Sequence, residues 1–520
     1  MADIVLINPR FEVSYWGMEH CLPLLGKRAN LPVACLPLLA ALTPEGHTVT
    51  LMDENVEAIN YERCARADIV GVTGMSVQRF RMKEILAELK RRGAFTVVGG
   101  PLVTVQEDYF EGMADVIFVG EAEETWPRFL GEWKHKLHQY RYEQAEKSDM
   151  TKVPTPRFDL LKTRHYAFGS LQFSRGCPFQ CEFCDIIVTF GRRPRLKTSE
   201  QVLKELDALW AEKMRVVFIV DDNLIGNKKA IKHVLREVTA WQVERGYPIT
   251  FFTEASIDLA DDAELMQLML DANIIATFVG IESPNEASLR ETKKFQNIRS
   301  GGSLLEKVHR IQDAGIEVWC GMIMGFDNDD ETIFDAQIEF VREARIAHSM
   351  SGMLYAVAKT PLHARLAAEG RLDPSDQPEF GTNVIPLKLS REELRDGYVK
   401  VMNELYTPEA YFGRLEDLWI KGNFYIGTSR AKYWKKHPFQ RLKMESIWLV
   451  QAIGLFIRFM TMIPEKHLRE EYQRRTWRYL KHRRNPGMLF TYMLKIAQHY
   501  HAHTMATQMK SGATQVYNSY

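Results

Sequence analysis

Residues 175–185 read RGCPFQCEFCD and hold three of the seven cysteines of the chain within eight positions. The thiols of Cys177, Cys181 and Cys184 follow the spacing C-x3-C-x2-C, and the glycine and proline around the first cysteine favour a loop. A structural zinc site usually has four ligands arranged as two separated pairs, and no second pair lies nearby. Three thiolates on one tight loop instead suit three corners of a 4Fe–4S cube, whose fourth iron stays open for chemistry.

An aromatic residue, Phe183, directly precedes the third cysteine. The pattern C-x3-C-x-aromatic-C resembles the signature of the radical SAM enzymes. In that family the open iron binds the amino and carboxylate groups of S-adenosylmethionine, and reduction of the cluster releases a 5′-deoxyadenosyl radical. The resemblance implies that Cys177, Cys181 and Cys184 are the metal ligands and catalytic residues, with Phe183 at the cofactor site.

The segments after the cysteines alternate between helix and strand patterns. Residues 198–212 have apolar side chains at helical spacing, with Ser199 as the expected cap. Strand patterns follow as VVFIVDD (216–222), ITFFTEAS (249–256), ATFVGIES (276–283) and EVWCGMIMGF (317–326), separated by helical segments. Such serial alternation predicts a parallel sheet closed into a partial (β/α) barrel over residues 166–375, with its active site at the carboxyl ends of the strands.

Polar and small residues occupy those strand ends, where the radical SAM family contacts S-adenosylmethionine. The expected cofactor contacts are Asp221, Asp222, Glu254, Ser256, Glu282, Gly321, Ile323 and Gly325. The segment GMIMGFDN (321–328) resembles the adenine-side motif G-x-I-x-G-x-x-E of the family, but Asn328 replaces its glutamate and receives no role. A single carboxylate after a strand often only caps a helix, so the prediction depends on the set as a whole.

Residues 1–145 have a strand–helix alternation of their own. Five apolar runs predict a doubly wound parallel sheet that binds its ligand beyond the carboxyl ends of the strands. Glycines there allow close approach of a bulky ligand, and the absence of G-x-G-x-x-G from the first turn argues against a dinucleotide. The expected ligand contacts are Asn55, Thr73, Gly74, Ser76, Gly99, Gly100, Gly120 and Glu121.

This arrangement resembles the cobalamin-binding domain that precedes the barrel in one large radical SAM class. Many cobalamin domains use D-x-H-x-x-G, in which the histidine ligates cobalt. The matching stretch here is DENVEA (53–58), where Asn55 replaces the histidine and Ala58 replaces the glycine. The resemblance therefore implies bound cobalamin whose cobalt has no histidine ligand from this position. The alternative is a sheet that has lost its ligand and serves as a scaffold.

After a linker at residues 146–165 and the barrel, residues 376–520 are expected to form a helical domain. Residues 446–463 are apolar with one charge, Arg458, and residues 466–484 hold eight Lys and Arg against two Glu. Three arrangements fit this pair: a buried helix beside a solvated basic one, peripheral contact with an anionic membrane surface, or a membrane span.

The composition limits the class of protein and its cellular location. The 520 residues include 67 Lys and Arg and 67 Asp and Glu, and a net charge of zero argues against a general nucleic-acid binder. The first residues, MADIVLINPR, read as a strand and not as a signal peptide, and the remaining cysteines are scattered. We therefore expect a cytoplasmic protein, with the inner membrane face as the place of any peripheral contact.

Taken in order, the chain resembles the cobalamin-dependent radical SAM proteins, and in particular the hopanoid C-2 methylase group. The resemblance implies C-methylation of an unactivated carbon of an apolar substrate such as a hopanoid-like lipid, with electrons from a flavodoxin or ferredoxin. In such a reaction one S-adenosylmethionine methylates cobalt(I) and a second yields the radical. Two alternatives stay open: an oxidative cyclase acting on a tetrapyrrole, and a non-catalytic iron–sulfur or cobalamin sensor.

Overall fold

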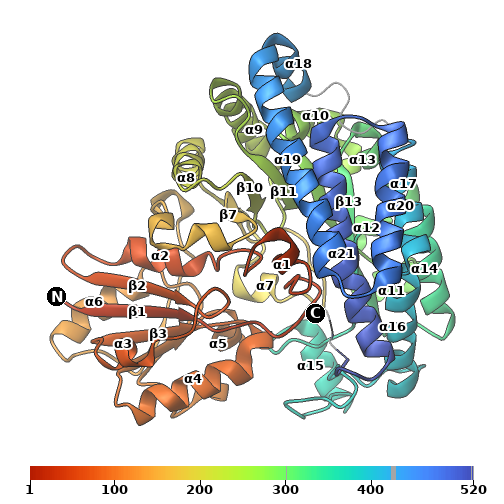
Figure 1. Ribbon diagram of the computed structural model, residues 1–520. Helices are drawn as coiled ribbons and strands as arrows, with labels where there is room; N and C mark the ends of the chain where they lie inside the picture. Colours follow the sequence, from red (N-terminus) through yellow and green to blue (C-terminus); the bar gives the residue numbers. More distant parts are fainter. Residues whose placement is uncertain (300, 423–428, 517, 519–520) are drawn as a thin grey trace.

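The computed structural model describes residues 1–299, 301–422, 429–516 and 518. It contains two parallel sheets and a C-terminal layer of helices (Figure 1). The N-terminal sheet lies to one side, and the barrel and the C-terminal helices form the larger part of the molecule.

The N-terminal sheet contains the five strands predicted from the sequence. They are β1 (Asp3–Asn8), β2 (Thr48–Asp53), β3 (Ile69–Thr73), β4 (Thr96–Gly99) and β5 (Val116–Val119). The order is β2-β1-β3-β4-β5-β6, and every neighbouring pair is parallel. The sixth strand, β6 (Arg141–Glu143), was not predicted, because only Tyr142 of its three residues is apolar and buried.

Helices cover both faces of this sheet. On one face α3 (Tyr61–Ala65), α4 (Arg79–Arg91) and α5 (Pro101–Val105) pack on the strands, and on the other face α2 (Cys35–Leu42) and α6 (Thr125–Lys134) do so. Side chains of β1 alternate between these two cores, since Val5 and Ile7 point to one and Ile4 and Leu6 to the other. This arrangement confirms the predicted doubly wound fold.

The second sheet is the predicted partial barrel. Its strands are β7 (Gly169–Leu171), β10 (Val216–Ile219), β11 (Thr250–Glu254), β12 (Ile274–Glu282), β13 (Glu317–Met324) and β14 (Ser349–Met353). They form the open parallel order β14-β13-β12-β11-β10-β7. The antiparallel pair β8 (Ser174–Arg175) and β9 (Arg195–Leu196) brackets the cysteine loop.

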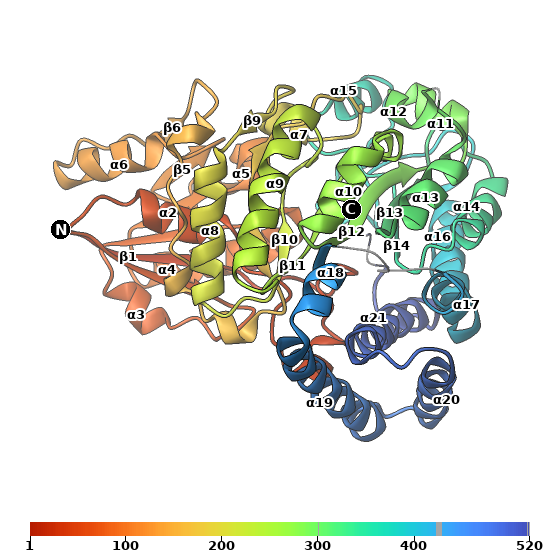
Figure 2. The same cartoon turned by 90° about the horizontal axis from the view of Figure 1, so that it is seen from above.

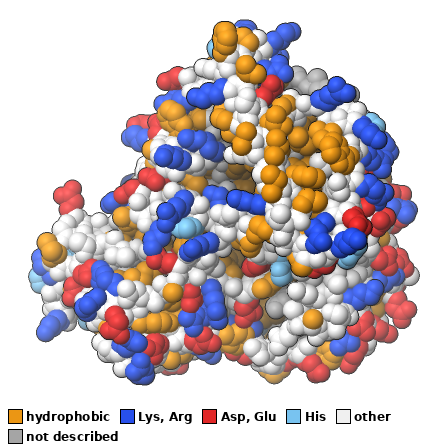
Figure 3. All heavy atoms as spheres, in the orientation of Figure 1, with side chains coloured by type: hydrophobic (Ala, Val, Ile, Leu, Met, Phe, Trp, Pro, Cys, Tyr) orange, Lys and Arg blue, Asp and Glu red, His pale blue; other side chains and the backbone are white. Residues whose placement is uncertain are grey.

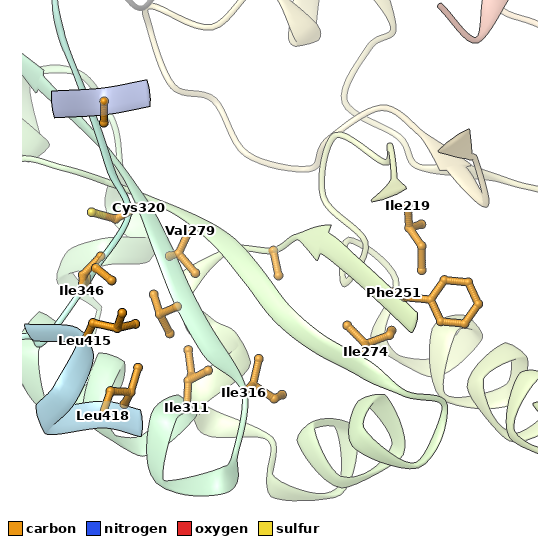
Figure 4. Packing of buried hydrophobic residues seen from close by; sticks show 14 of the residues in the cluster. Ile219, Phe251, Ile274, Val279, Ile311, Ile316, Cys320, Ile346, Leu415 and Leu418 are labelled. Atoms are coloured by element: carbon orange, nitrogen blue, oxygen red, sulfur yellow. The ribbon is translucent and has the colours of Figure 1, made fainter. Parts of the chain in front are cut away.

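Helices surround the barrel on its outer face, as Figure 2 shows. The main ones are α8 (Ser199–Ala211), α9 (Lys228–Glu244), α10 (Ala263–Asp271), α13 (Leu304–Ala314) and α14 (Thr332–Glu343). Between them and the sheet, alternate strand residues such as Phe251 and Val279 enter a continuous apolar core (Figure 4). The sequence prediction misplaced the cap of α8: Thr198, not Ser199, accepts the hydrogen bond from the backbone N–H of Gln201.

Among the described residues, six helices follow the barrel. They are α16 (Arg391–Leu405), α17 (Pro408–Trp419), α18 (Ser429–Lys436), α19 (Pro438–Met462), α20 (Lys466–His482) and α21 (Pro486–Lys510). In the described part of the chain no strand follows β14, as predicted. Leu415 and Leu418 of α17 extend the barrel core, so these helices are packed on the barrel rather than tethered to it (Figure 4).

Candidate functional site

The carboxyl edges of the two sheets face each other across the cysteine loop. Arg175, two residues before Cys177, donates to Glu121 at 2.6 Å and to Glu123 at 2.7 Å, and both glutamates follow β5. Arg195 donates to Glu121 as well, at 2.9 Å. Ligands bound at the two edges would therefore meet in one shared space.

The chain enters the cysteine loop through Gly176. Its φ is +98°, and a Cβ at this position would lie 2.9 Å from the carbonyl oxygen of Gly191. Asp222 accepts a hydrogen bond of 2.6 Å from the backbone N–H of Gly176. Asp221 accepts from the backbone N–H groups of Phe173 and Ser174 and from the Ser174 hydroxyl. Both aspartates therefore shape the approach to the loop, and the oxygens of Asp221 are already used for that purpose.

The cysteine loop is held by contacts from the segment before and within α12 (Phe295–Ile298) and from α15 (Pro361–Ala368). Gln296 donates to the Sγ of Cys181 at 3.4 Å. Glu182 donates through its N–H to the carbonyl of Thr292, and its own carbonyl accepts from Leu362. Burial raises the pKa of the Cys177 and Cys184 thiols. A cationic cluster in contact with them would favour the thiolates that it needs as ligands.

Three thiols on one loop match the number of protein ligands of a 4Fe–4S cluster with one open iron. In the described ranges, no three His, Cys, Asp or Glu side chains are grouped closely enough to hold one metal ion. In a 4Fe–4S cube each thiolate binds a different iron, so the sulfurs stand apart. Cys177, Cys181 and Cys184 are carried by one anchored loop, and their role as the cluster ligands stays a prediction.

Carboxylates gather at the carboxyl edge of the barrel beside the loop. Burial, followed by the charges of Asp222 and Asp221, raises the pKa of Glu254 to about 8. Burial also raises the pKa of Asp222 to about 6. Glu282, at the end of β12, pairs with Lys294 at 2.6 Å and has a φ of +65°. Among the described residues, no ion pair is formed by Asp221, Asp222 or Glu254. The aspartates accept hydrogen bonds from the approach to the cysteine loop, whereas the Glu254 carboxylate accepts none, so a ligand ammonium would fit beside it.

Ser256 is engaged within its own loop. Its hydroxyl donates to Asp258 at 2.5 Å and accepts from Asn223 at 3.1 Å. It positions the turn after β11, and its expected contact with a cofactor stays a prediction.

The turn after β13 is held by an acid that the motif comparison missed. Asp329 accepts from the backbone N–H groups of Gly325 at 3.0 Å and Phe326 at 3.1 Å. Position 325 requires a glycine, because its φ is +101°. Asn328 donates to Glu291 and not toward the strand end. The acidic run DNDD at residues 327–330 could have identified Asp329, which lies one position beyond the end of the family motif.

Phe183 joins the cysteine loop to this turn. Its ring lies 6.1 Å from the ring of Phe326, and it packs against the cluster that contains Ile323. Gly321 and Ile323 both belong to β13, so the predicted adenine-side residues and the cysteine loop are brought together.

The carboxyl edge of the N-terminal sheet is a shelf with few side chains. Gly100 has a φ of +106°, and a Cβ there would lie 2.3 Å from the hydroxyl of Thr73. At Gly120, with a φ of +79°, a Cβ would meet nothing within 4 Å. Gly74 and Gly99 lie against Met82 and Phe118 respectively, and Ser76 is exposed. A broad, flat ligand such as the corrin ring of cobalamin suits such a surface.

Two residues expected to contact this ligand have other partners. The carboxylate of Glu121 is 2% exposed and pairs with Arg175 and Arg195, which makes a contact between the two sheets; its expected contact with the ligand stays a prediction. Asn55 donates to Asp53 at 2.7 Å and accepts from the N–H of Phe11 at 2.9 Å. It fastens the loop after β1 at the position where other cobalamin domains have their histidine.

Sequence reasoning also missed Arg175, Lys294 and Gln296. Arg175 lies inside the quoted cysteine segment, but its partners are more than 50 residues away. Lys294 and Gln296 come from the irregular segment around α12 (Phe295–Ile298), which has no periodic pattern to identify them.

Comparison with known proteins gives three family matches along the chain. Residues 31–130 match the B12 binding domain, residues 171–338 the radical SAM superfamily, and residues 360–515 a domain of unknown function, DUF4070. An uncharacterised methyltransferase of Synechocystis sp. is 40% identical over 84% of this chain and 81% of its own length. The hopanoid C-2 methylase of Rhodopseudomonas palustris is 34% identical over 79% of this chain and 78% of its own length.

A solved structure shares the complete architecture. The cobalamin-dependent S-adenosylmethionine radical enzyme OxsB, with aqua-cobalamin and S-adenosylmethionine bound, superimposes with a TM-score of 0.60. The match covers 99% of this chain and 81% of that one at 14% identity, and so concerns the fold.

Proposed function

Because this chain belongs to the cobalamin-dependent radical SAM methyltransferases, the family of the hopanoid C-2 methylase, we propose that it methylates an unactivated carbon of an apolar, hopanoid-like lipid. A 4Fe–4S cluster, S-adenosylmethionine and cobalamin supply the radical and methyl-transfer chemistry when bound. The chain itself must hold the acceptor carbon beside them, exclude water and keep competing groups away.

The observation that carries the proposed substrate is an aromatic layer on the inner face of the barrel. Four neighbouring strands contribute one ring each: Phe218, Phe252, Phe278 and Trp319. The Phe218 and Phe252 rings stack at 4.8 Å, and the Phe252 and Trp319 rings lie 5.3 Å apart. Phe168 and Trp16 add rings 5.0 and 5.4 Å from Phe252 and Phe278.

This layer lies directly below the carboxylates of the barrel edge. Phe252 and Glu254 are two residues apart on β11 and therefore point to the same face. On β12 the strand is irregular before Glu282, but the Glu282 carboxylate lies over Gly280, which is two residues from Phe278 and faces the same side. Two residues of a strand span about 6.6 Å. An apolar molecule against the rings would therefore present a carbon near the group bound at the strand ends.

The inner face is also less filled than the outer one. Phe218, Phe278 and Trp319 are partly exposed, whereas Val217, Val279 and Val318, their neighbours on the outer face, are at most 1% exposed. Large aromatic surfaces that stay accessible inside a barrel favour a ligand that covers them. An apolar ligand would gain the burial of these rings.

An ion pair and aromatic side chains lie at the far end of the inner face. Lys495 of α21 pairs with Glu317 at 2.7 Å, and its Nζ lies 4.8 Å from the centre of the Trp319 ring. Tyr15 and Tyr406 share a hydrogen bond of 2.7 Å beside it. A substrate would then reach the rings from the carboxyl edge, on the side where the two sheets meet.

The proposal includes two partners and a location. The reaction of this family needs an electron donor, for which a flavodoxin or ferredoxin is proposed. A cytoplasmic site of action, with peripheral contact to the inner face of a membrane, would bring the enzyme to an apolar substrate.

The test follows a labelled methyl group. The anaerobically reconstituted enzyme receives methyl-labelled S-adenosylmethionine, a reductant and a cell extract separated into lipid, pigment and peptide fractions. Label in an apolar lipid is expected, and Phe278→Ala should raise the KM for that lipid about tenfold or more, since burying an aromatic ring contributes a few kcal/mol. Label confined to pigments or peptides would overturn the proposed substrate while leaving methyl transfer intact.

Trp210→Ala is a suitable control, because Trp210 lies on the outer helix α8 and is 38% exposed. It should leave the KM unchanged. Deoxyadenosine formation without any labelled product would instead support the oxidative cyclase.

A further inference from the structure

The helix α19 presents an apolar face to the outside of the molecule. One side of the helix packs on α21, where Ala452, Leu455 and Phe459 are buried. The opposite side carries large apolar residues that are between 41% and 87% exposed. We call them the α19 stripe: Phe439, Leu442, Leu449, Val450, Ile453 and Ile457. Figure 3 shows hydrophobic side chains gathered over α19, with Lys and Arg side chains around them.

This result corrects one of the three arrangements that the sequence left open, because the apolar run is not a buried core helix. Only 17% of the apolar window of α19 is buried, which argues against a core helix. By length and composition the helix could cross a membrane. One side remains fixed to the folded domain, and Arg458 donates to the carbonyl of Leu24 in α1 (Leu22–Leu25) at 3.0 Å. A helix held along one side by α21 and α1 cannot be surrounded by lipid, so a span does not fit either.

The charge around the stripe is strongly positive. Residues 429–484 contain fifteen Lys and Arg and four Glu, a net charge of +11 in a chain whose total is zero. Lys435, Lys436 and Lys443 are exposed at the beginning of the stripe, and within the described residues no ion pair involves them. Lys466 is exposed just beyond its end. An apolar stripe with cations at both ends has the pattern of a helix that lies in a membrane interface.

We infer that the α19 stripe docks on an anionic lipid monolayer, with α19 parallel to the membrane plane and its outer side chains among the acyl chains. The stripe would enter about 5–10 Å, to the boundary between headgroups and acyl chains. The lysines would meet anionic headgroups. A second copy of this chain fits the surface less well, because the unpaired lysines beside the stripe of one copy would face those of the other.

The inference goes beyond the proposed methylation, because it concerns a surface outside the barrel. It would hold for any substrate, and a lipid substrate would gain from it by a short path from the bilayer. Its test therefore uses no substrate.

The experiment measures flotation of the purified full-length holoenzyme with vesicles of phosphatidylcholine alone or with added phosphatidylglycerol. Binding is expected on the anionic vesicles and should weaken with salt. The double substitution Val450→Asp and Ile453→Asp should abolish it. Replacement of Lys435, Lys436 and Lys443 by Gln should weaken it by about fivefold for each lysine removed.

The control is Leu137→Asp, which places one such charge on a comparably exposed leucine of the N-terminal domain, and the single substitution Val450→Asp is compared with it directly. Leu137→Asp should bind like the unmodified enzyme. Iron content and unfolding temperature establish that the stripe variants are folded. Equal flotation of the Val450/Ile453 variant, or no flotation of the unmodified enzyme, would overturn the inference. So would a dimer in solution that becomes a monomer in that variant, because the occupant would then be a second copy.

Discussion

The carboxyl edge of the N-terminal sheet and that of the barrel face each other, but they present different chemistry. The first edge consists largely of backbone, with Gly74, Gly99, Gly100 and Gly120 at its strand ends. The second carries buried carboxylates beside three thiols. A large flat ligand is held by a surface without side chains, whereas a small charged ligand needs charged groups around it. The difference explains how one molecule can place two unlike cofactors face to face.

Removing one thiol should have the largest effect, because it abolishes cluster chemistry at the barrel edge and leaves the other edge intact. Cys181→Ala leaves two of the three cluster ligands, so SAM cleavage should fall below detection and iron content should drop, while cobalamin binding at the other edge remains. Iron, acid-labile sulfide and deoxyadenosine formation measure this outcome.

The control is Cys320→Ala, another buried cysteine, whose thiol donates to Ser349 at 3.4 Å on the outer side of β13. It should keep its iron and lose only some stability. A Cys181→Ala enzyme with full iron content would contradict the cluster assignment.

Breaking the contact between the two edges should have the next largest effect. Arg175→Met leaves Glu123 without its cation in a buried setting, where Arg175 is 8% exposed. A loss of about 3–5 kcal/mol in stability is expected. The edges should also separate, so that SAM is still cleaved but less methylated product forms. Calorimetry and the ratio of product to deoxyadenosine measure both effects.

A second ion pair between the two parts provides the comparison. Asp376, which pairs with Arg79 at 3.1 Å, is 46% exposed. Asp376→Asn should cost less than about 1 kcal/mol and leave the product ratio unchanged. Equal effects of the two substitutions would mean that the buried pair does not hold the edges together.

Adding a methyl group to the glycine shelf should weaken the binding of cobalamin and of no other cofactor. Gly120→Ala should cost about 1–2 kcal/mol for its positive φ, and its Cβ would protrude into the space that the corrin is expected to fill. Gly93→Ala, at the opposite end of the sheet, meets the same φ cost at +71° and equally open space. Both variants should lose similar stability, but only Gly120→Ala should bind cobalamin about tenfold or more weakly. Equal cobalamin affinity would move the ligand away from this shelf.

The sequence allowed the strands of both edges to be predicted where they are apolar and long enough, as in β1 and β13. It did not reveal β7 and β14, because Gly-Ser-Leu and Ser-Met-Ser-Gly-Met lack the β-branched and aromatic residues of a strand pattern. The register of these two strands is set by their neighbours β10 and β13.

The site was predictable to a similar degree. The three cysteines share one short motif, and spacing alone identifies them. Arg175 and Lys294 acquire their roles from partners far along the chain or outside any pattern, so only the folded arrangement identifies them. The outer face of α19 was ambiguous for a related reason: composition gives its apolarity, but only packing on α21 decides which side stays exposed.

The smallest expected effect is the release of one proton from the barrel edge when S-adenosylmethionine binds. Burial and the neighbouring aspartates raise the pKa of Glu254 to about 8, so its carboxyl is largely protonated at pH 7. An ammonium group placed beside it would favour the ionised form. Binding of S-adenosylmethionine at pH 7 should therefore release close to one proton, which calorimetry in buffers of different ionisation enthalpy detects. Glu254→Gln should abolish the release and weaken binding.

The same carboxyl should oppose folding as the pH rises. Its pKa is higher in the folded chain than in the unfolded one, so the unfolded chain gives up the proton first, and stability falls between about pH 4.5 and pH 8. Glu254→Gln should then unfold a few degrees higher than the unmodified enzyme at pH 8, and at the same temperature near pH 4. Glu19→Gln is the control: burial raises the pKa of Glu19 to about 7, and Glu19 belongs to the loop between β1 and α1, not to the barrel strands. It should reproduce the gain in stability and leave the proton release on binding unchanged. If both substitutions alter the release, the proton comes from a general change in the fold, and the ammonium does not bind at Glu254.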